Sequence, residues 1–362
     1  MIMNITIIGT GNVGCTLAAD LTHKGHSVSL LKTSTQQSRN FDAILHDGVI
    51  CVSDPYCGDY SVKLDRVFNQ EYEKAIAGAD IILITVQTNY HESVIKRISH
   101  LLRSGQILFF VPGYLSTCYV LKHCHKNLTV IEAESSPIDC RIIKPGESTV
   151  LFKNVLNPVG VFPISRKREV SEALSLLGYP FRFTENVIEA ALHNPNLIVH
   201  TVGALFSIPR IEYTHGEYWM YKEVFTPHVW NICESLDKEK LTVLASLGIT
   251  NSLSYVEACQ ERNFINDHRS PQESFFDYAH NSSPKGPSVV DSRYLTEDVS
   301  QGLVMLESLG QVLNIPTPTS SSLITLASMS LSRDFRDEGR TIHKLGESFI
   351  HKIIDDYHVK QS

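Results

Sequence analysis

Three features that the 362-residue sequence lacks limit the class of protein. Its eight cysteines include no Cys-x-x-Cys pair, so free thiols in a reducing cytoplasm fit best. No apolar run is long enough to cross a bilayer, because the best candidate, 107–111, ends at Pro112-Gly113. Basic residues are not in excess, and the net charge of −7 argues against nucleic acid as the main partner.

What is present is an ordinary globular composition, 43% hydrophobic and 20% charged. The length exceeds what one core usually spans, so two domains are expected. The first predicted strand begins at the N-terminus, so we expect no secretory signal peptide, a cytoplasmic location and no membrane partner. The sequence contains no internal repeat and no low-complexity tract.

The most informative stretch is the N-terminal Asn-Ile-Thr-Ile-Ile-Gly-Thr-Gly-Asn-Val-Gly. The β-branched run at 5–8 predicts a buried strand, and a helix is predicted over 15–23. Gly9 permits a tight turn, Gly11 lets the backbone approach a pyrophosphate, and Gly14 lets the helix pack closely. The helix N–H groups would then face the phosphates. A glycine-rich turn without a ligand is the alternative. The predicted cofactor-binding residues of this loop are Gly9, Thr10, Gly11, Asn12, Val13 and Gly14.

The second predicted strand, 26–31, should end beside the adenosine ribose. An acidic residue there would bond the 2′-hydroxyl and select NAD, whereas basic and hydroxyl residues accommodate a 2′-phosphate. The chain has Lys32, Thr33 and Ser34 at this point and Arg39 soon after, with no carboxylate before position 42. The sequence therefore favours NADP, with NAD as the second choice; a solvated loop is the structural alternative.

The first half of the chain alternates strands with helices, which predicts a parallel, doubly wound α/β sheet. The carboxyl ends of its strands, near Val86, Pro112 and 134–136, should line the nicotinamide crevice. Strands or a hairpin are predicted at 48–52 and 61–67. The remaining strands are predicted at 80–86, 106–111, 128–131, 140–143, 149–153, 160–162 and 179–183, and helices at 72–77, 90–102 and 166–177.

The pattern becomes helical after about Thr184. We therefore predict a dinucleotide-binding (Rossmann) domain at 1–184 and an all-helical substrate and catalytic domain at 185–362. The first helix, 187–206, contains Pro195, which should kink it. Further helices are predicted at 217–234, 238–247, 255–262, 272–278, 299–313, 320–331 and 349–357, and a Ser/Pro/Gly-rich loop at 281–288.

A dehydrogenase of this layout needs a proton donor or acceptor beside the hydride chemistry of its cofactor. Histidine suits that task because its ordinary pKa is near neutrality, but sixteen histidines select nothing by themselves. His200 differs from the others in lying mid-helix among apolar residues, with Asn196 one turn earlier on the same face. From the pattern alone, a satisfied core or interface histidine is the favoured interpretation.

Three segments resemble the opine dehydrogenases, the octopine/nopaline dehydrogenase family. They are the glycine loop, the helix segment Asn194-Pro195-Asn196-Leu197-Ile198-Val199-His200, and 292–303, which reads Ser-Arg-Tyr-Leu-Thr-Glu-Asp-Val-Ser-Gln-Gly-Leu. The segments 314–318 and 334–341 also resemble the family's C-terminal part. The resemblance spans nearly the whole chain, and the last two of the three segments are far more specific than the glycines.

The resemblance implies reductive condensation: a 2-oxo acid and the amino group of an amino acid form an imine, and NAD(P)H reduces it to a secondary amine dicarboxylate. Carried over by position, His200 is the general acid/base and Asp298 the carboxylate that orients its ring. Arg293 would clamp the oxo-acid carboxylate, and Asn196 would contact the substrate. The structural alternative is a salt-bridged helix start with Asp298 as its N-cap.

The sequence departs from some family members at 111–114, Val-Pro-Gly-Tyr, which lacks the glutamine that they place against the oxo acid. The amino-acid pocket is expected between 213 and 230. Cys118 with 123–125, His-Cys-His, could ligate a metal, but the spacing puts neighbours on opposite faces, and we predict no metal site. The charged run 333–340 is assigned no role.

Two other classes fit the same layout. A ketopantoate reductase-like or glycerol-3-phosphate dehydrogenase-like enzyme would use a catalytic lysine on the second domain's helices, and no lysine lies between Glu185 and Tyr221. A catalytically inactive, NADP-binding sensor is the second alternative. We expect small-molecule substrates as the partners and a homodimer as the assembly.

Overall fold

The computed structural model describes residues 2–264 and 266–361 and divides the chain into two compact units. The first unit comprises Met1–Val187 and Asp356–Ser362, and the second comprises Ile188–Asp355. The predicted limit between the two domains is residue 184, with 185–362 as one domain. No helix of the described residues is both long enough and apolar enough to cross a membrane.

The first unit is built on an eight-stranded sheet in the order β12-β11-β8-β7-β6-β1-β2-β5. All neighbours pair in parallel except β11 and β8, which are antiparallel. The predicted parallel α/β fold is therefore confirmed, with one antiparallel pair towards an edge. The strands are β1 (Asn4–Ile8), β2 (Ser27–Lys32), β5 (Arg66–Asn69), β6 (Ile81–Ile84), β7 (Ile107–Phe110), β8 (Thr129–Ala133), β11 (Asn157–Phe162) and β12 (Phe181–Phe183).

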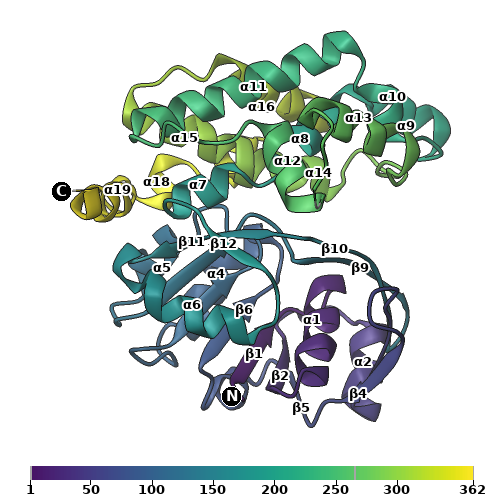
Figure 1. Cartoon of the computed structure of the whole chain (residues 1–362), viewed down its shortest axis with the longest axis vertical. Helices are drawn as coiled ribbons and strands as arrows, with labels where there is room; N and C mark the ends of the chain where they lie inside the picture. The colour runs from purple at the N-terminus through teal and green to yellow at the C-terminus, as the bar shows by residue number, and fades with distance from the viewer. Residues whose placement is uncertain (1, 265, 362) are drawn as a thin grey trace. The chain divides into compact units, whose positions relative to one another are not determined.

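A second, four-stranded sheet was not predicted as a separate sheet. Its order is β4 (Tyr60–Lys63), β3 (Val49–Ser53), β10 (Glu147–Lys153) and β9 (Ile138–Lys144). The hairpin predicted for 48–52 and 61–67 is confirmed in that β3 and β4 pair antiparallel. The extent of the second strand is wrong, because 61–67 divides into β4 of this sheet and β5 of the main sheet. Helix α1 (Asn12–His23) contacts β1 and β2 on one side and β4, β9 and β10 on the other, so it lies between the two sheets (Figure 1).

The helix after the glycine loop is buried because it is covered from both sides. Leu17 and Leu21, the pair predicted to share a face, are both almost fully buried. Helices α2 and α5 of this unit were not predicted. The helices of the first unit after α1 are α2 (Arg39–Asp47), α3 (Tyr72–Ile76), α4 (His91–Ile98), α5 (Thr117–His123) and α6 (Lys167–Leu176), with short 3-10 turns η1 (Thr88–Tyr90) and η2 (Ile164–Arg166).

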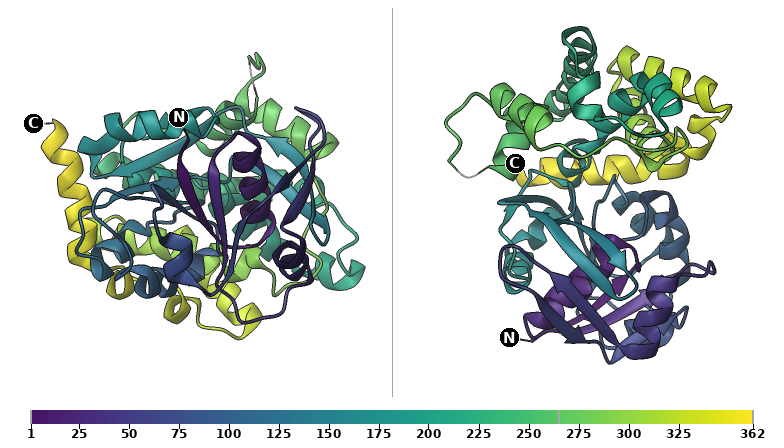
Figure 2. Two further views of the ribbon diagram at one scale, coloured as in Figure 1. Left: turned by 90° about the horizontal axis from the view of Figure 1, so that it is seen from below. Right: turned by 90° about the vertical axis from the view of Figure 1, so that its right-hand side faces the viewer.

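The second unit contains helices and loops throughout its described residues (Figure 2). Its central element is α8 (Asn196–Phe206), which contacts α10, α11, α14, α16 and the turn η3. The other elements are α7 (Val187–Leu192), α9 (Ile208–Thr214), α10 (Met220–Val224), α11 (Pro227–Ser246), α12 (Tyr255–Asn263), α13 (Pro271–Asn281), α14 (Arg293–Thr296), η3 (Asp298–Leu303), α15 (Val304–Leu313), α16 (Pro318–Leu331), α17 (Phe335–Glu338) and α18 (Ile342–Leu345), and α19 (Glu347–Gln361) continues into the first unit.

Two helix predictions in this unit are wrong for the same reason. The predicted kinked helix 187–206 is two helices, because α7 ends at Leu192 and Pro195 is the N-cap of α8. The predicted helices 217–234 and 238–247 are instead α10 and the long α11, which has Pro227 at its first position. Proline lacks an N–H and has a fixed φ, so it starts a helix more readily than it interrupts one.

The helix predicted at 299–313 is continuous, but its first part is not an α-helix. Residues Asp298–Leu303 form a π-helical turn, η3, and the α-helix α15 begins only at Val304. Single π-turns within helices are uncommon and occur frequently at functional sites. This turn carries Asp298, the predicted carboxylate partner of His200.

Candidate functional site

The glycine loop joins β1 to α1 and leaves room for a ligand at one position. Gly9 has φ +125°, and a Cβ there would lie 2.6 Å from Thr85 Oγ1. A Cβ on Gly14 would lie 2.0 Å from Gly9 O. Gly11 has nothing within 4 Å of the position of its Cβ. The first and third glycines are therefore required by the fold, whereas the open space at Gly11 leaves room for a close approach from outside, which fits a bound pyrophosphate.

The residues between the glycines frame the start of α1. Gly11 is the N-cap of the helix and supplies no side-chain cap, so the first-turn N–H groups are available to an anion. Thr10 and Val13 are half-buried, and Asn12 is exposed. The side chain of Asn12 accepts a hydrogen bond from Ile142 N at 2.9 Å, which ties the loop to β9.

The end of β2 has the residues that the sequence predicts to meet the ribose. Lys32 is buried, and its Nζ donates to Ser34 O at 2.6 Å. Thr33 is half-buried, whereas Ser34 and Arg39 are exposed. Gln70 follows β5 and donates to Ser34 O at 3.2 Å through Nε2, so it supports the same turn. The structure thus presents hydroxyl and guanidinium groups here.

The carboxyl ends of β6 to β8 have a buried polar network that sequence reasoning missed. Val86, predicted to contact the cofactor, is half-buried, and its carbonyl lies 3.2 Å from Nε2 of the fully buried His91. Glu132 of β8 is fully buried and accepts hydrogen bonds from Leu115 N, Thr117 N and Thr117 Oγ1 at 2.6–2.7 Å. A carboxylate directly after the apolar residues Val130 and Ile131 was the signal that could have identified it. Glu132 fixes the loop that follows β7.

In the second unit, the structure brings His200 and Asp298 together. His200 Nδ1 lies 2.8 Å from Asp298 Oδ2, and the two side chains are 9% and 2% exposed. The ionised carboxylate accepts only, so His200 Nδ1 donates and the ring takes a single tautomer with Nε2 left for chemistry. Among the described residues, Nε2 has no hydrogen-bond partner. The alternative role of Asp298 as a capping residue does not fit, since Glu297 occupies the N-cap of η3.

A third residue, Tyr294, packs against this pair and had no predicted role. Its ring is stacked on that of His200, with centroids 3.6 Å apart and 6° between the planes. The sequence segment contained Tyr294, but stacking depends on how α14 meets α8 and has no local signal. The imidazole is therefore fixed by a hydrogen bond at its edge and an aromatic ring on its face.

Each of the two predicted substrate-binding residues precedes one member of the pair in the sequence: Asn196 precedes His200, and Arg293 precedes Asp298. Asn196 is the first residue of α8, half-buried and one turn before His200. Arg293 directly precedes Tyr294; its side chain is 56% exposed, and Nε lies 3.8 Å from Glu297 Oε2. An exposed guanidinium at this place is accessible to a substrate carboxylate.

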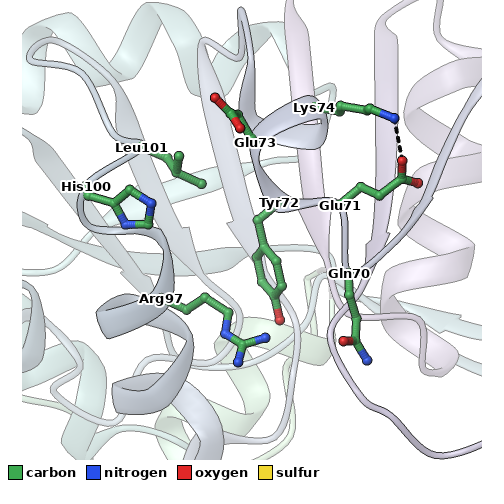
Figure 3. A pocket seen from close by; sticks show the side chains of 8 residues that line it. All are labelled: Gln70, Glu71, Tyr72, Glu73, Lys74, Arg97, His100 and Leu101. Atoms are coloured by element: carbon green, nitrogen blue, oxygen red, sulfur yellow. Dashed lines mark hydrogen bonds and ion pairs between the residues drawn. The ribbon is translucent and has the colours of Figure 1, made fainter.

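A surface pocket of about 410 Å³ lies in the first unit between α3 and α4 (Figure 3). Its lining includes two carboxylates and two cations, and one pair of these, Lys74 and Glu71, forms an ion pair of 2.6 Å. The mixed charge favours neither an anion nor a cation, and we assign the pocket no ligand. The lining residues are Gln70, Glu71, Tyr72, Glu73, Lys74, Arg97, His100 and Leu101.

Two other constellations singled out in the sequence have structural partners. His123 Nε2 lies 2.8 Å from Glu92 Oε1, and in the described part of the chain no three His, Cys, Asp or Glu side chains are grouped to hold a metal ion. In the charged run 333–340, Arg336 makes a two-pronged ion pair with Glu307, with distances of 2.7 and 2.8 Å. The run is therefore engaged within the second unit.

Comparisons with known protein families divide the chain in a similar way. Residues 183–331 match the family model described as NAD/NADP octopine/nopaline dehydrogenase, alpha-helical domain. Residues 5–130 match the model described as Ketopantoate reductase PanE/ApbA.

Relatives match over nearly the full length. The chain is 28% identical to the opine dehydrogenase of Arthrobacter sp. (strain 1C) over 350 residues, 94% of each chain. It is 25% identical to the vitopine synthase of Allorhizobium ampelinum, covering 97% of this chain and 98% of that protein. Among solved structures, octopine dehydrogenase in complex with NADH and agmatine is similar with a TM-score of 0.78 at 16% identity, covering 98% of both chains.

A Rossmann unit with an open glycine loop, followed by a helical unit that holds a histidine–carboxylate pair, defines an NAD(P)-dependent oxidoreductase. Within that class, the helical unit is decisive, because it matches the octopine/nopaline model and contains the pair. The chain is similar to opine dehydrogenases over nearly its whole length, and residues 183–331 match the octopine/nopaline dehydrogenase model.

Proposed function

We propose that this protein is an opine dehydrogenase that reductively condenses a 2-oxo acid with the amino group of an amino acid, and that His200 and Asp298 are its proton-transfer pair. The observation that carries the proposal is the 2.8 Å contact between His200 Nδ1 and Asp298 Oδ2 within the helical unit. Relatives over 94% of the chain are named for this chemistry.

The roles follow from the geometry of the pair. Asp298 accepts the Nδ1 proton and stabilises the imidazolium, so His200 Nε2 is the atom that gives or takes a proton at the substrate nitrogen. A proton is needed there because imine formation and reduction both change the protonation of that nitrogen. Arg293 is proposed to bind the oxo-acid carboxylate through its two-donor fork, and Asn196 to contact the substrate from one turn before His200.

The cofactor proposed is NADP, with NAD as the second choice. The first-turn N–H groups of α1 and the free space at Gly11 would hold the pyrophosphate. Ser34 and Arg39, exposed beyond β2, would hold a 2′-phosphate. When bound, the nicotinamide would supply the hydride. A solved relative, yersinopine dehydrogenase, has been seen with NADP⁺ bound, with a TM-score of 0.73 and 14% identity to this chain.

A ketopantoate reductase-like activity is the alternative that the match of residues 5–130 brings forward. That match covers dinucleotide-binding strands and helices, which many reductases share. Such an enzyme would need a catalytic lysine on the helices of the second domain, and no lysine lies between Glu185 and Tyr221.

We also propose a homodimer in the cytoplasm with small-molecule substrates.

The proposal is tested by following NADPH and NADH oxidation with a panel of 2-oxo acids, each crossed with a panel of amino acids. Oxidation that requires both an oxo acid and an amino acid, with a secondary amine dicarboxylate identified by mass spectrometry, supports it. Oxidation with ketopantoate alone would assign the chain to the alternative class. Tight NADPH binding with no oxidation in any pairing would identify a nucleotide-binding sensor.

A further inference from the structure

The carboxylate of the proposed catalytic pair stands on an unusual piece of backbone. Asp298 begins η3, the π-helical turn, and all six residues of that turn are buried. A π-turn moves each backbone hydrogen bond one residue further along the chain than an α-helix does, and such turns are rare without outside support. The direction of the Asp298 side chain therefore depends on whatever keeps this turn from relaxing into an α-helix.

The support comes from a segment about forty residues downstream, at the end of the charged run. Arg340 N donates to Ser300 O at 3.0 Å, so a carbonyl of the turn is bonded from outside the helix. Arg340 Nε donates to Gln301 Oε1 at 2.9 Å. On the other side, Ser308 Oγ donates to Arg340 O at 3.0 Å. Arg340 is fully buried, so one residue ties η3 to α15 by three hydrogen bonds.

Gly339, the residue before Arg340, leaves the space that the chain needs to approach Ser300. A Cβ on Gly339 would lie 2.4 Å from Ser300 O and 2.9 Å from Val304 Cβ. No side chain fits at position 339. The φ of Gly339, −89°, is accessible to any residue, so glycine is required there only because of the limited space. Gln301 extends the contact inward, because its Nε2 donates to Ser300 Oγ at 2.9 Å.

We propose that Gly339 and Arg340 are positioning residues that hold the π-turn in the shape that directs Asp298 at His200. The inference rests on the proposed function for its catalytic consequence, but its structural content is independent of any substrate. Displacing 339–340 from Ser300 lets η3 relax, which moves the Asp298 carboxylate away from His200 Nδ1. A misplacement of about 1 Å in such a group costs about 100-fold in rate.

The test compares Gly339→Ala with a matched control, Gly310→Ala. A Cβ on Gly310 would lie 2.7 Å from Ile315 O, so both substitutions create a clash with a backbone carbonyl in the same unit. Only the first clash is with the π-turn. We expect similar losses of Tm in both variants. Gly339→Ala alone should lower kcat, by about 100-fold, with the Kd for NADPH unchanged.

A second readout does not depend on activity. In NMR spectra of wild type, the His200 Nδ1 proton in its hydrogen bond to Asp298 should appear at low field and be assigned by its loss in His200→Gln. We expect that signal to disappear in Gly339→Ala and to persist in Gly310→Ala. Should Gly339→Ala fail to fold, Gln301→Met, which keeps the volume and removes both amide hydrogen bonds, replaces it.

Equal kcat values in Gly339→Ala and Gly310→Ala, or an unchanged His200 signal in Gly339→Ala or its replacement, would overturn the inference. If wild type shows no oxidation with any substrate pair, the proposed function fails, and the NMR signal alone then decides whether 339–340 positions Asp298. The two failures are therefore distinguishable.

Discussion

The ring of Tyr294 lies flat on the imidazole of His200, with 3.6 Å between the ring centroids. We predict that this stacking, and not the tyrosine hydroxyl, keeps the imidazole in place, because Asp298 bonds only the edge of the ring. An aromatic pair is worth about 1 kcal/mol beyond its buried area, or roughly fivefold in rate. Tyr294→Phe should keep kcat within about twofold, whereas Tyr294→Leu should lower it about fivefold to tenfold. Equal kcat values for the two variants would contradict the prediction.

The glycine loop gives a prediction that separates ligand contact from folding. Gly11→Ala places a methyl group in open space, so Tm should equal that of wild type while the Kd for NADPH rises at least about tenfold. Gly14→Ala places its methyl group 2.0 Å from Gly9 O, so Tm itself should fall. Thermal unfolding measures Tm, and fluorescence titration measures the Kd for NADPH. An unchanged Kd in Gly11→Ala would show that no phosphate approaches this loop.

The end of β2 should determine the choice of cofactor. Ser34→Asp supplies the carboxylate that this position lacks, which would repel a 2′-phosphate and bond a 2′-hydroxyl. The KM for NADPH should rise at least about tenfold, and the KM for NADH should stay the same or fall. Ser322→Asp, an exposed serine of α16, adds the same charge elsewhere and should change neither. A wild type that already prefers NADH would contradict the NADP proposal.

The ion pair between Glu307 and Arg336 should make stability depend on pH. Burial by itself raises the pKa of Glu307, but hydrogen bonds from Arg336 and Ser321 outweigh burial and leave the pKa below its usual 4.5. Because the folded-state pKa is the lower one, the stabilisation is complete above pH 4.5 and is lost as the pH falls through the folded value.

Glu307→Gln should therefore lower Tm at pH 7, and the difference from wild type should shrink as the pH is lowered below 4.5. Glu71→Gln is the matched control, since Glu71 pairs with Lys74 on the exposed surface and such pairs contribute little. A Tm difference for Glu307→Gln that is constant from pH 7 to pH 3.5, roughly one unit below the usual value, would refute the coupling.

Local patterns predicted the main sheet and the glycine loop because both depend on neighbours in sequence. Buried strands such as β6 and β7 are continuous apolar runs, and the spacing of the glycines reflects the turn itself. The second sheet was not predicted as a unit because β3 and β10 pair in parallel from distant parts of the chain. No local pattern records that pairing.

Local sequence patterns also predicted the candidate site only in part. Resemblance to a family identified His200 and Asp298, whereas periodicity alone favoured an ordinary core histidine. The stacking of Tyr294 and the π-turn escaped prediction because each depends on contacts between separate elements, whereas the buried Glu132 had a signal within its own strand. Residues 298–303 have the composition of an α-helix start, and the contact that accompanies their π geometry comes from Arg340.

The central claim is that His200 and Asp298 act as one proton-transfer unit, and a double-mutant cycle tests it most directly. The measurement is the single-turnover rate of NADPH oxidation with the substrate pair that the panel identifies, in wild type, His200→Gln, Asp298→Asn and the double variant. Each single change should lower the rate by about 100-fold or more with the Kd for NADPH unchanged, and the double variant should be no slower than the slower single one. Near-wild-type rates in either single variant, or losses that multiply in full in the double variant, would contradict the account.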